Sequence, residues 1–284
     1  MTWTLSVSTL ITPELRILNF IEKNRDKLAA FDEVLLVCQI RAHSMPMFPT
    51  GFLPANCRVI ESASVGISAS RNVGLDHFRG DVIWLMDDDV LFGSNLSEIK
   101  AAIENSSADL NTLRIQDTQS DALYKRYGPE RDLGALDLLQ VSSIEITCRK
   151  SFLERTGLRF PEWIGVGTPL PSGEENLFLN QALKRGARIR HLPLVGCRHP
   201  RLAPEVKAIW SRPNRTTCMG IVARQYGLTG LLLCARWFIR GLGAGVKTRA
   251  LIDLWRGYFG SGNHVPKEWS SGFPAKAPVA SITG

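Results

Sequence analysis

Apolar residues in the first third of the chain occur in two alternating patterns. Short segments at residues 4–10, 33–40 and 82–86 predict strands. The first alternates apolar residues with Ser6 and Ser8, and the other two are largely apolar. Between the first two segments, residues 11–30 repeat large apolar side chains at helical intervals, which predicts a helix. A strand, a helix and a second strand in this order favour parallel pairing with a right-handed crossover. The 82–86 run contains no polar position, as is typical of a strand covered by helices on both faces.

The same alternation continues along the chain, which favours a mixed, mostly parallel sheet flanked by helices. Residues 41–56 and 116–136 contain too many breakers or polar residues for regular structure. Further strands are predicted over residues 58–60, 109–115, 139–148 and 187–192. Further helices are predicted over residues 94–105, 150–156 and 174–185.

A helix is also predicted directly ahead of the 82–86 strand. Ile67, Arg71 and Leu75 fall on one helical face, Ser64 is suited to be its N-cap, and Gly80 is suited to the position just after its end. Arg71 therefore supplies a cation close to the end of the following strand.

Three consecutive carboxylates, Asp87, Asp88 and Asp89, follow the apolar strand. They lie at its carboxyl end, and in open α/β sheets ligands bind at that edge. Closely packed carboxylates repel one another unless a cation neutralises them, and a divalent metal is the simplest such cation. The alternative is that the three acids only end the strand.

Two segments carry a resemblance to a known family. Residues 69–75, followed by an apolar strand and the DxD-type run 87–89, resemble the donor-site signature of family 2 glycosyltransferases. Residues 173–176, followed by a helix, a strand and His199, resemble the acidic acceptor-side motif and late histidine of that family. The resemblance spans about residues 4–199 and implies the GT-A fold.

The resemblance also implies roles for the acids of the donor site. Asp87 would hold the ribose or nucleotide, Asp89 would ligate Mn²⁺ or Mg²⁺, and Asp88 would support either task. His199 would be a second metal ligand, since imidazole nitrogen suits Mn²⁺ better than Mg²⁺. The alternative for His199 is an ordinary surface or core histidine.

Donor recognition involves two further candidates, Arg71 and Gln39. In the resembled family the second strand usually ends in acids that contact the nucleotide base. Here residues 37–40 contain no acid, but the Gln39 amide both donates and accepts hydrogen bonds. This departure leaves the base open, although we favour a UDP-sugar. A glutamine at a strand end is otherwise simply solvated.

On the acceptor side, the resemblance makes Glu175 the base that removes the acceptor proton, with Glu174 as the second candidate. The sequence from Ser172 to Glu175 also fits a helix capping box, which would explain Glu175 without catalysis. Trp163, in a glycine- and proline-rich segment, is a candidate to stack on the acceptor sugar. Its alternative role is packing alone.

The positive charge of the chain is concentrated near its end. Residues 205–284 contain 11 Lys and Arg against 3 Asp and Glu, whereas residues 1–204 contain 23 against 24. We therefore predict a catalytic domain over 1–204 and a basic helical extension over 205–284. Within it, the apolar run 219–242 is interrupted by Arg236 and Arg240, which suits a helix lying on an anionic membrane. The alternative is a helix packed on the catalytic domain.

The rest of the composition constrains the class of protein. Six scattered cysteines suggest neither a disulfide scaffold nor a zinc site, and no signal peptide is recognisable, so we expect a cytoplasmic protein that is peripheral at the inner membrane face. The near-neutral catalytic part argues against nucleic acid as a partner.

The combined prediction is an inverting, metal-dependent glycosyltransferase. It would move a sugar from a nucleotide-sugar donor to a glycan or lipid-linked acceptor in polysaccharide biosynthesis. Two alternatives stay open. One is a metal-dependent nucleotidyl or phosphoryl transferase, and the other is a non-catalytic, nucleotide-binding partner of a membrane complex.

Overall fold

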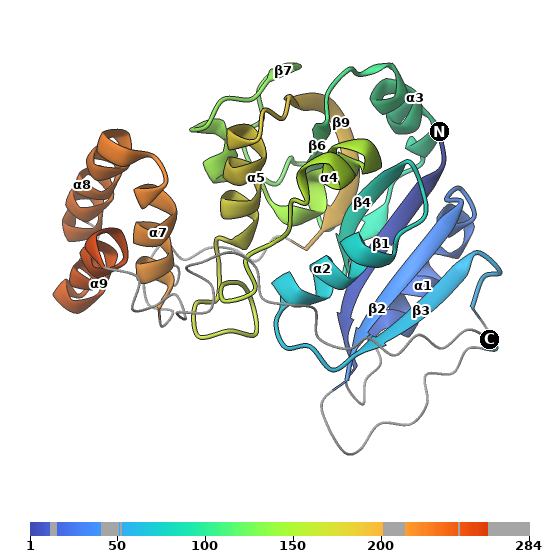
Figure 1. The fold of residues 1–284 in the computed structure, drawn as a ribbon, viewed down its shortest axis with the longest axis horizontal. Helices are drawn as coiled ribbons and strands as arrows, with labels where there is room; N and C mark the ends of the chain where they lie inside the picture. Colours follow the sequence, from blue (N-terminus) through green and yellow to red (C-terminus); the bar gives the residue numbers. More distant parts are fainter. Residues whose placement is uncertain (12–15, 41–50, 52, 201–213, 244, 261–284) are drawn as a thin grey trace.

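The computed structural model describes residues 1–11, 16–40, 51, 53–200, 214–243 and 245–260. Within these residues, nine strands form one sheet with helices on both faces, and three further helices stand beside it (Figure 1). The strand order is β3 (Cys57–Ser62), β2 (Glu33–Gln39), β1 (Trp3–Leu10), β4 (Val82–Asp87), β8 (Ile146–Arg149), β6 (Leu110–Asp117), β9 (Ile189–His199) and β5 (Leu91–Phe92), with β7 (Arg131–Asp132) also paired to β9.

Most strands run in one direction, as the sequence predicts. β1 pairs in parallel with β2 and β4, β2 pairs in parallel with β3, and β6 pairs in parallel with β9. The shorter strands β5, β7 and β8 run antiparallel to their neighbours. Since Leu10 pairs with Gln39, and Ser8 with Asp87, the carboxyl ends of β1, β2 and β4 share one edge.

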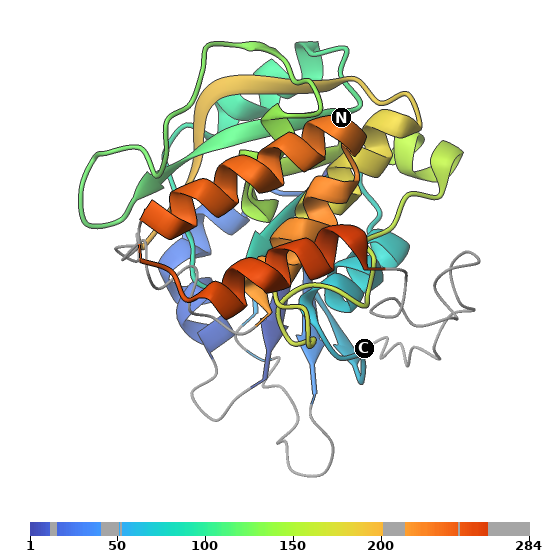
Figure 2. The same cartoon turned by 90° about the vertical axis from the view of Figure 1, so that its left-hand side faces the viewer.

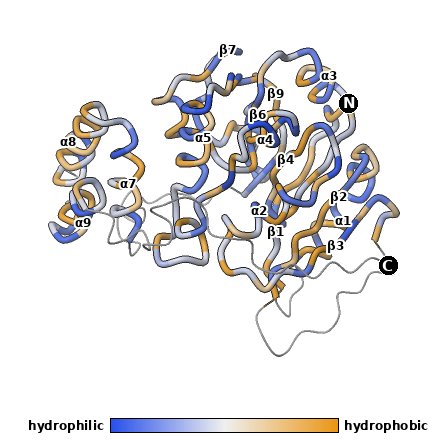
Figure 3. Tube along the Cα trace, viewed as in Figure 1, coloured by the Kyte–Doolittle hydropathy of each residue, from blue (hydrophilic) through white to orange (hydrophobic). Residues whose placement is uncertain are grey.

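Helices α1 (Arg16–Leu28) and α3 (Leu96–Asn105) pack on one face of the sheet through buried apolar side chains. Helices α2 (Ile67–His77), α4 (Lys150–Thr156) and α5 (Glu174–Lys184) pack on the other. Apolar positions gather along the strands between these layers (Figure 3). The fully covered β4 explains why its sequence lacks polar alternation.

The predicted ends of α2 are wrong. Its N-cap is Gly66 rather than Ser64, because the backbone there has φ +95° and the next amide, of Ile67, donates to Val166 O at 2.8 Å. The helix ends at His77 with Phe78 as C-cap. Gly80 has a different role, since a Cβ at that residue would lie 2.8 Å from the backbone nitrogen of Thr4.

The strand predicted over 139–148 is largely wrong as well. Two 3₁₀ turns, η1 (Asp137–Gln140) and η2 (Ser143–Glu145), occupy half of it, and β8 begins only at Ile146. A capping box between Ser142 and Glu145 stabilises η2. By contrast, β9 is longer than the strand predicted over 187–192 and continues past Pro193. Its register with β6 shifts near this proline, which has no amide hydrogen to donate to the neighbouring strand.

The C-terminal extension contains α7 (Arg215–Arg224), α8 (Gly227–Gly243) and α9 (Thr248–Phe259), which stand beside α5 (Figures 1 and 2). The apolar run 219–242 is thus split between two helices, at Gly227, where φ is +54°. Cys218 and Val222 of α7 pack with Leu177 of α5. None of the helices in the described ranges has the length and apolarity needed to cross a bilayer.

The predicted boundary between residues 204 and 205 lies outside the described residues.

Candidate active site

Two of the three aspartates at the end of β4 contact an arginine from α1. Asp87 is the last residue of the strand, and Asp88 and Asp89 form the turn into β5. Nη2 of Arg16 lies 3.3 Å from Asp88 Oδ1 and 3.0 Å from Asp89 Oδ2. Arg16 therefore neutralises part of the negative charge in this structure. A single arginine at the start of a helix has no sequence signature, so sequence reasoning missed it.

Asp88 and Asp89 have different environments. Burial raises the pKa of Asp88, although its Oδ2 accepts a 2.6 Å hydrogen bond from the Thr9 hydroxyl. A hydrogen bond from His199 lowers the pKa of Asp89. Asp89 is therefore the carboxylate that stays ionised most readily, as a metal ligand requires.

His199, the last residue of β9, lies against Asp89 as predicted from its late position in the sequence. Its Nε2 atom is 3.3 Å from Asp89 Oδ1, and its Nδ1 atom is 2.9 Å from the carbonyl oxygen of Pro200. The hydrogen bond with Asp89 raises the pKa of His199. The rings of Tyr124 and His199 pack edge to face, with their centroids 5.7 Å apart.

Asp89 and His199 suit a metal ion whose remaining ligands come from water and substrate. A carboxylate oxygen and an imidazole nitrogen, from Asp89 and His199, suit Mn²⁺, and Mg²⁺ usually keeps several waters and substrate phosphates. Within the described ranges no cluster of three or more His, Cys, Asp or Glu side chains is arranged to hold a metal. A complete shell would therefore require water and donor phosphate oxygens in addition to these two side chains.

Arg71 connects the end of β4 with the start of α5. Its buried guanidinium contacts Asp87 Oδ1 at 3.1 Å, Glu174 Oε1 at 2.9 Å and the Ser143 hydroxyl at 2.6 Å. It also lies over the ring of Phe160 at 5.6 Å. The predicted cation beside the acids is present, and one side chain orients groups from β4, α5 and η2.

Glu174 and Glu175 begin α5, and they differ in burial and in hydrogen bonding. Glu174 is 5% exposed and bonds to Arg71, while its Oε2 atom has no hydrogen-bond partner within the described part of the chain. Glu175 is partly buried, and burial together with the Glu174 charge raises its pKa to about 8. The capping box expected at Ser172 is absent. The N-cap is Gly173, with φ +100° and no side-chain capping bond, so capping does not explain Glu175.

The remaining two candidates make structural contacts. The Gln39 amide nitrogen donates to Ser64 O at 3.0 Å and to Gly66 O at 2.9 Å, which fixes the loop ahead of α2. Trp163 is partly buried and packs against the cluster that joins α5 to α7. These contacts occupy the donor atoms of Gln39 and part of the Trp163 ring.

A comparison with protein-family models matches residues 49–152 to glycosyl transferase family 2. The matched residues include Arg71 and all three aspartates. The resemblance noted from the sequence is confirmed, and the chain is a glycosyltransferase. A search of the curated proteins gives no match.

Solved structures support the fold. The chain is similar to S. aureus TarS residues 1–349, with 16% identity, TM-score 0.55, and coverage of 95% of this chain and 77% of that one. The same TarS fragment in complex with UDP-GlcNAc matches at 18% identity and TM-score 0.55, over 79% and 66% of the two chains. A longer TarS structure matches at 18% identity and TM-score 0.55, over 78% of this chain and 39% of that one. The predicted GT-A fold class is therefore confirmed.

Proposed function

We propose that the enzyme transfers a sugar from a nucleotide-sugar donor, with a UDP-sugar favoured, to a glycan or lipid-linked acceptor with inversion at the anomeric carbon. The observation that carries this proposal is the meeting of Asp87, Asp89 and His199 with Arg71 and Glu175 at one edge of the sheet. The UDP-GlcNAc complex of TarS, a protein of the same fold, supports the choice of UDP.

Binding of the donor is assigned to the strand ends and to Arg71. Asp87 lies beside Ser8 in the paired strands β1 and β4, and the buried Ser8 hydroxyl has no hydrogen-bond partner within the described ranges. Carboxylates in such a position suit the hydroxyls of a ribose. Asp87 and Asp88 would therefore hold the nucleoside, with Arg71 fixing the orientation of Asp87. Gln39 would contribute through the loop that it fixes or through its amide oxygen.

Asp89 and His199 would hold Mn²⁺ or Mg²⁺. When bound, the ion would neutralise charge that develops on the diphosphate leaving group. Arg16 contacts Asp88 and Asp89, so its side chain places a positive charge close to the proposed metal site. It is 53% exposed, so its side chain is able to turn toward the diphosphate when the aspartates bind another cation.

Proton removal from the acceptor hydroxyl is assigned to Glu175. Its raised pKa makes it a stronger base than an ordinary carboxylate. Glu174 is held by Arg71 and acts as a positioning residue, which keeps the start of α5 aligned with β4. General-base catalysis of this kind contributes about 10² to 10⁴ in rate. Trp163 would bind the acceptor sugar with the part of its ring that is not packed.

The extension is assigned to an anionic membrane surface on the inner face. Leu228, Leu232, Ile239 and Leu242 lie on one side of α8 and are exposed, with Leu228 at 82%. Arg236 and Arg240 flank this row, and α7 and α8 contain no acid. Apolar side chains beside arginines suit insertion at the level of lipid headgroups. Packing of α7 on α5 would hold this row at a fixed orientation to the active site.

A screen of nucleotide-sugars, with Mn²⁺ and a panel of glycan and lipid-linked acceptors, tests the proposal. Mass spectrometry would detect a product heavier by one sugar residue, and NMR of its anomeric proton would report the configuration. Cleavage of nucleoside triphosphates without sugar transfer would favour a nucleotidyl or phosphoryl transferase. Nucleotide binding without turnover of any donor would favour the non-catalytic alternative.

A further inference from the structure

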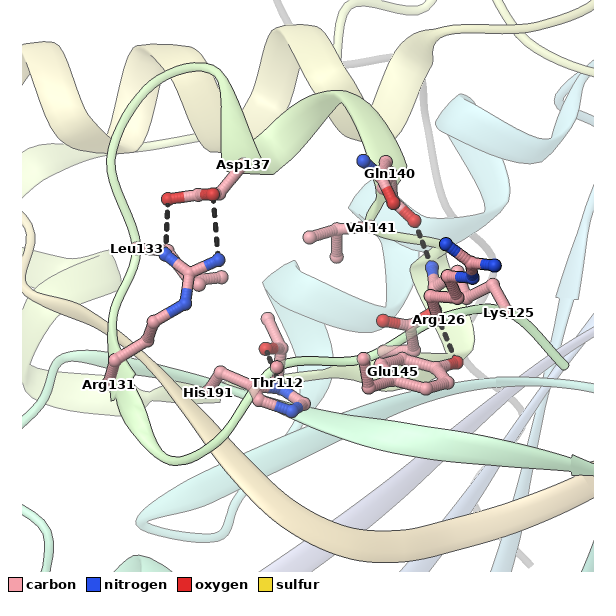
Figure 4. Close-up of a pocket in the computed structure, with 12 residues that line it drawn as sticks. Thr112, Lys125, Arg126, Arg131, Leu133, Asp137, Gln140, Val141, Glu145 and His191 are labelled. Atoms are coloured by element: carbon pink, nitrogen blue, oxygen red, sulfur yellow. Dashed lines mark hydrogen bonds and ion pairs between the residues drawn. The ribbon is translucent and has the colours of Figure 1, made fainter. Parts of the chain in front are cut away.

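A second cavity lies on the α5 side of the sheet, well away from the aspartates. It has a volume of about 70 Å³ and is bordered by β6, β9, η1, η2 and the segment that leads into β7 (Figure 4). Its His191 pairs with Thr112 near the start of β9, whereas His199 ends that strand. Eight residues of extended strand separate the two histidines, which corresponds to about 26 Å.

One wall of this cavity contains a buried polar atom without a partner. His191 is 5% exposed, and its Nε2 atom has no hydrogen-bond partner in the described part of the chain. Its Nδ1 atom lies 3.2 Å from the Thr112 hydroxyl. The ring of Tyr127 stacks on the imidazole at 5.7 Å with an interplanar angle of 6°. The orientation of the ring is therefore fixed, and Nε2 is a buried polar atom whose hydrogen-bonding capacity is unused.

The charges around the cavity favour an anion. Arg131 forms a bidentate pair with Asp137 at 2.7 and 2.8 Å, and Lys125 contacts Glu145. Both acids are thereby neutralised. Arg126 also lines the cavity, and no ion pair holds it within the described ranges. The lining is therefore positive overall, and each cation keeps additional hydrogen-bond donors.

The size admits a small ligand group. A water molecule needs about 10–15 Å³ of such a volume, so the cavity of about 70 Å³ holds several waters. A single oxyanion group therefore fits this space. Leu133 and Val141 supply the apolar part of the lining, which lowers the competition from bulk water.

We propose that this cavity binds one oxyanion group, a phosphate or a carboxylate, between His191 Nε2 and the Arg126 side chain. The group would belong either to a free anion or to an acidic glycan chain that crosses the surface beside residues 125–131. The inference does not depend on the proposed donor and acceptor roles, because the residues assigned to those roles are not among the residues that line the cavity.

The titration of His191 supplies a specific readout. Burial lowers its pKa, and so do the charges of Arg114 and Arg131, with a smaller contribution from Lys125. The acids on the adjoining turns, Glu145 and Asp137, are already paired. A bound anion would stabilise the imidazolium form, so it would raise the pKa of His191, and by linkage it would bind more tightly at lower pH.

The experiment uses the full chain labelled at histidine, with saturating UDP and Mg²⁺ to occupy the donor site. Inorganic phosphate, acetate and a tetragalacturonate are titrated at constant ionic strength, with chloride as the reference, and the His191 resonance is followed by NMR. We expect phosphate or acetate to raise the pKa of His191. Arg126→Gln should weaken this binding at least fivefold, and the matched surface variant Arg155→Gln should leave it unchanged.

Comparing the ligands distinguishes an oxyanion group on an acidic glycan chain from one on a free anion. Tighter binding of tetragalacturonate than of acetate, with the same sensitivity to Arg126→Gln, indicates an acidic glycan chain, and equal or weaker binding indicates a free anion. A His191 resonance that responds no more to these anions than to chloride would overturn the proposal. Equal anion affinities in the wild type and in Arg126→Gln would overturn it as well.

Discussion

Nη1 of Arg71 lies 2.9 Å from Oε1 of Glu174, and this buried ion pair connects helix α2 to the first turn of helix α5. The same guanidinium contacts Asp87 at the end of β4. One side chain therefore holds Asp87 and Glu174, and movement of either helix would disturb both acids.

The first prediction concerns this ion pair. Arg71→Ala leaves the 5% exposed Glu174 as a buried charge without its partner, so we expect a loss of about 3 kcal/mol in the free energy of unfolding. Chemical denaturation measures it. Arg159→Ala is the control, because its pair with Asp76 is more exposed, and we expect a loss of about 1 kcal/mol or less. Similar losses in the two variants would contradict the importance of the buried pair.

The second prediction concerns Glu175 in catalysis. Glu175→Gln should keep donor affinity but reduce kcat by about 10²-fold or more, because the acceptor hydroxyl loses its base. In the wild type, kcat/KM should rise as pH increases through the pKa of this carboxyl group, about 8, and level off above it. Initial rates between pH 5.5 and 9 test both statements. Full activity of Glu175→Gln with an unchanged pH profile would exclude this role.

The raised pKa of Glu175 also predicts how stability depends on pH. The folded state holds this proton more tightly than the unfolded state, so the stability contributed by the protonated group is present below the unfolded pKa and declines as pH rises to about 8. Glu175→Gln should reduce this decline and raise Tm relative to the wild type above pH 8. A lower Tm for the variant at every pH would indicate a structural role for Glu175.

Much of the scaffold was predictable because burial leaves a clear periodic pattern. The strand Val82–Asp87 is covered on both faces, so its apolar run identified it, and the acids that follow it had to lie at the sheet edge. The predicted strand over 139–148 failed because alternating Ile144 and Ile146 also fit a 3₁₀ turn that leads into a short strand. Alternation over so few residues does not separate the two structures.

The donor and metal candidates were predictable to different degrees. The contact between Asp89 and His199 followed from a motif order, although more than 100 residues separate them in the sequence. The contact of Arg16 with the aspartates was not foreseen, because it depends on how α1 packs on the sheet. The N-cap of α5 was misassigned to Ser172, since the positive φ of Gly173 is set by tertiary contacts that the local sequence does not record.

The third prediction concerns the cation site. Asp89→Ala and His199→Ala should each weaken Mn²⁺-dependent UDP binding at least tenfold, because each removes a proposed ligand. Arg16→Gln should instead tighten binding of Mn²⁺ alone, since it removes a competing positive charge 3.0 Å from Asp89. Electron paramagnetic resonance of free Mn²⁺ measures these affinities. Unchanged Mn²⁺ affinity in all three variants would contradict the assignment.

The fourth prediction concerns the exposed side of α8. Replacing both Leu232 and Ile239 with Asp should abolish sedimentation with vesicles rich in anionic lipid, because each change places a charge where apolar contact is proposed. Arg155→Gln, on α4, is the matched control and should leave sedimentation unchanged. Undiminished sedimentation of the double variant would refute lipid contact through α8, and retained donor turnover would show that it is folded.

The central claim, that the aspartate edge of the sheet binds the diphosphate of a nucleotide-sugar together with a metal ion, is tested most directly by a crystal structure with UDP and Mn²⁺. We expect an anomalous Mn²⁺ peak in contact with Asp89 and His199, with diphosphate oxygens completing the coordination shell of the ion and the ribose beside Asp87. A structure in which UDP is bound elsewhere, with these side chains still paired to Arg16 and no Mn²⁺ peak beside them, would contradict it.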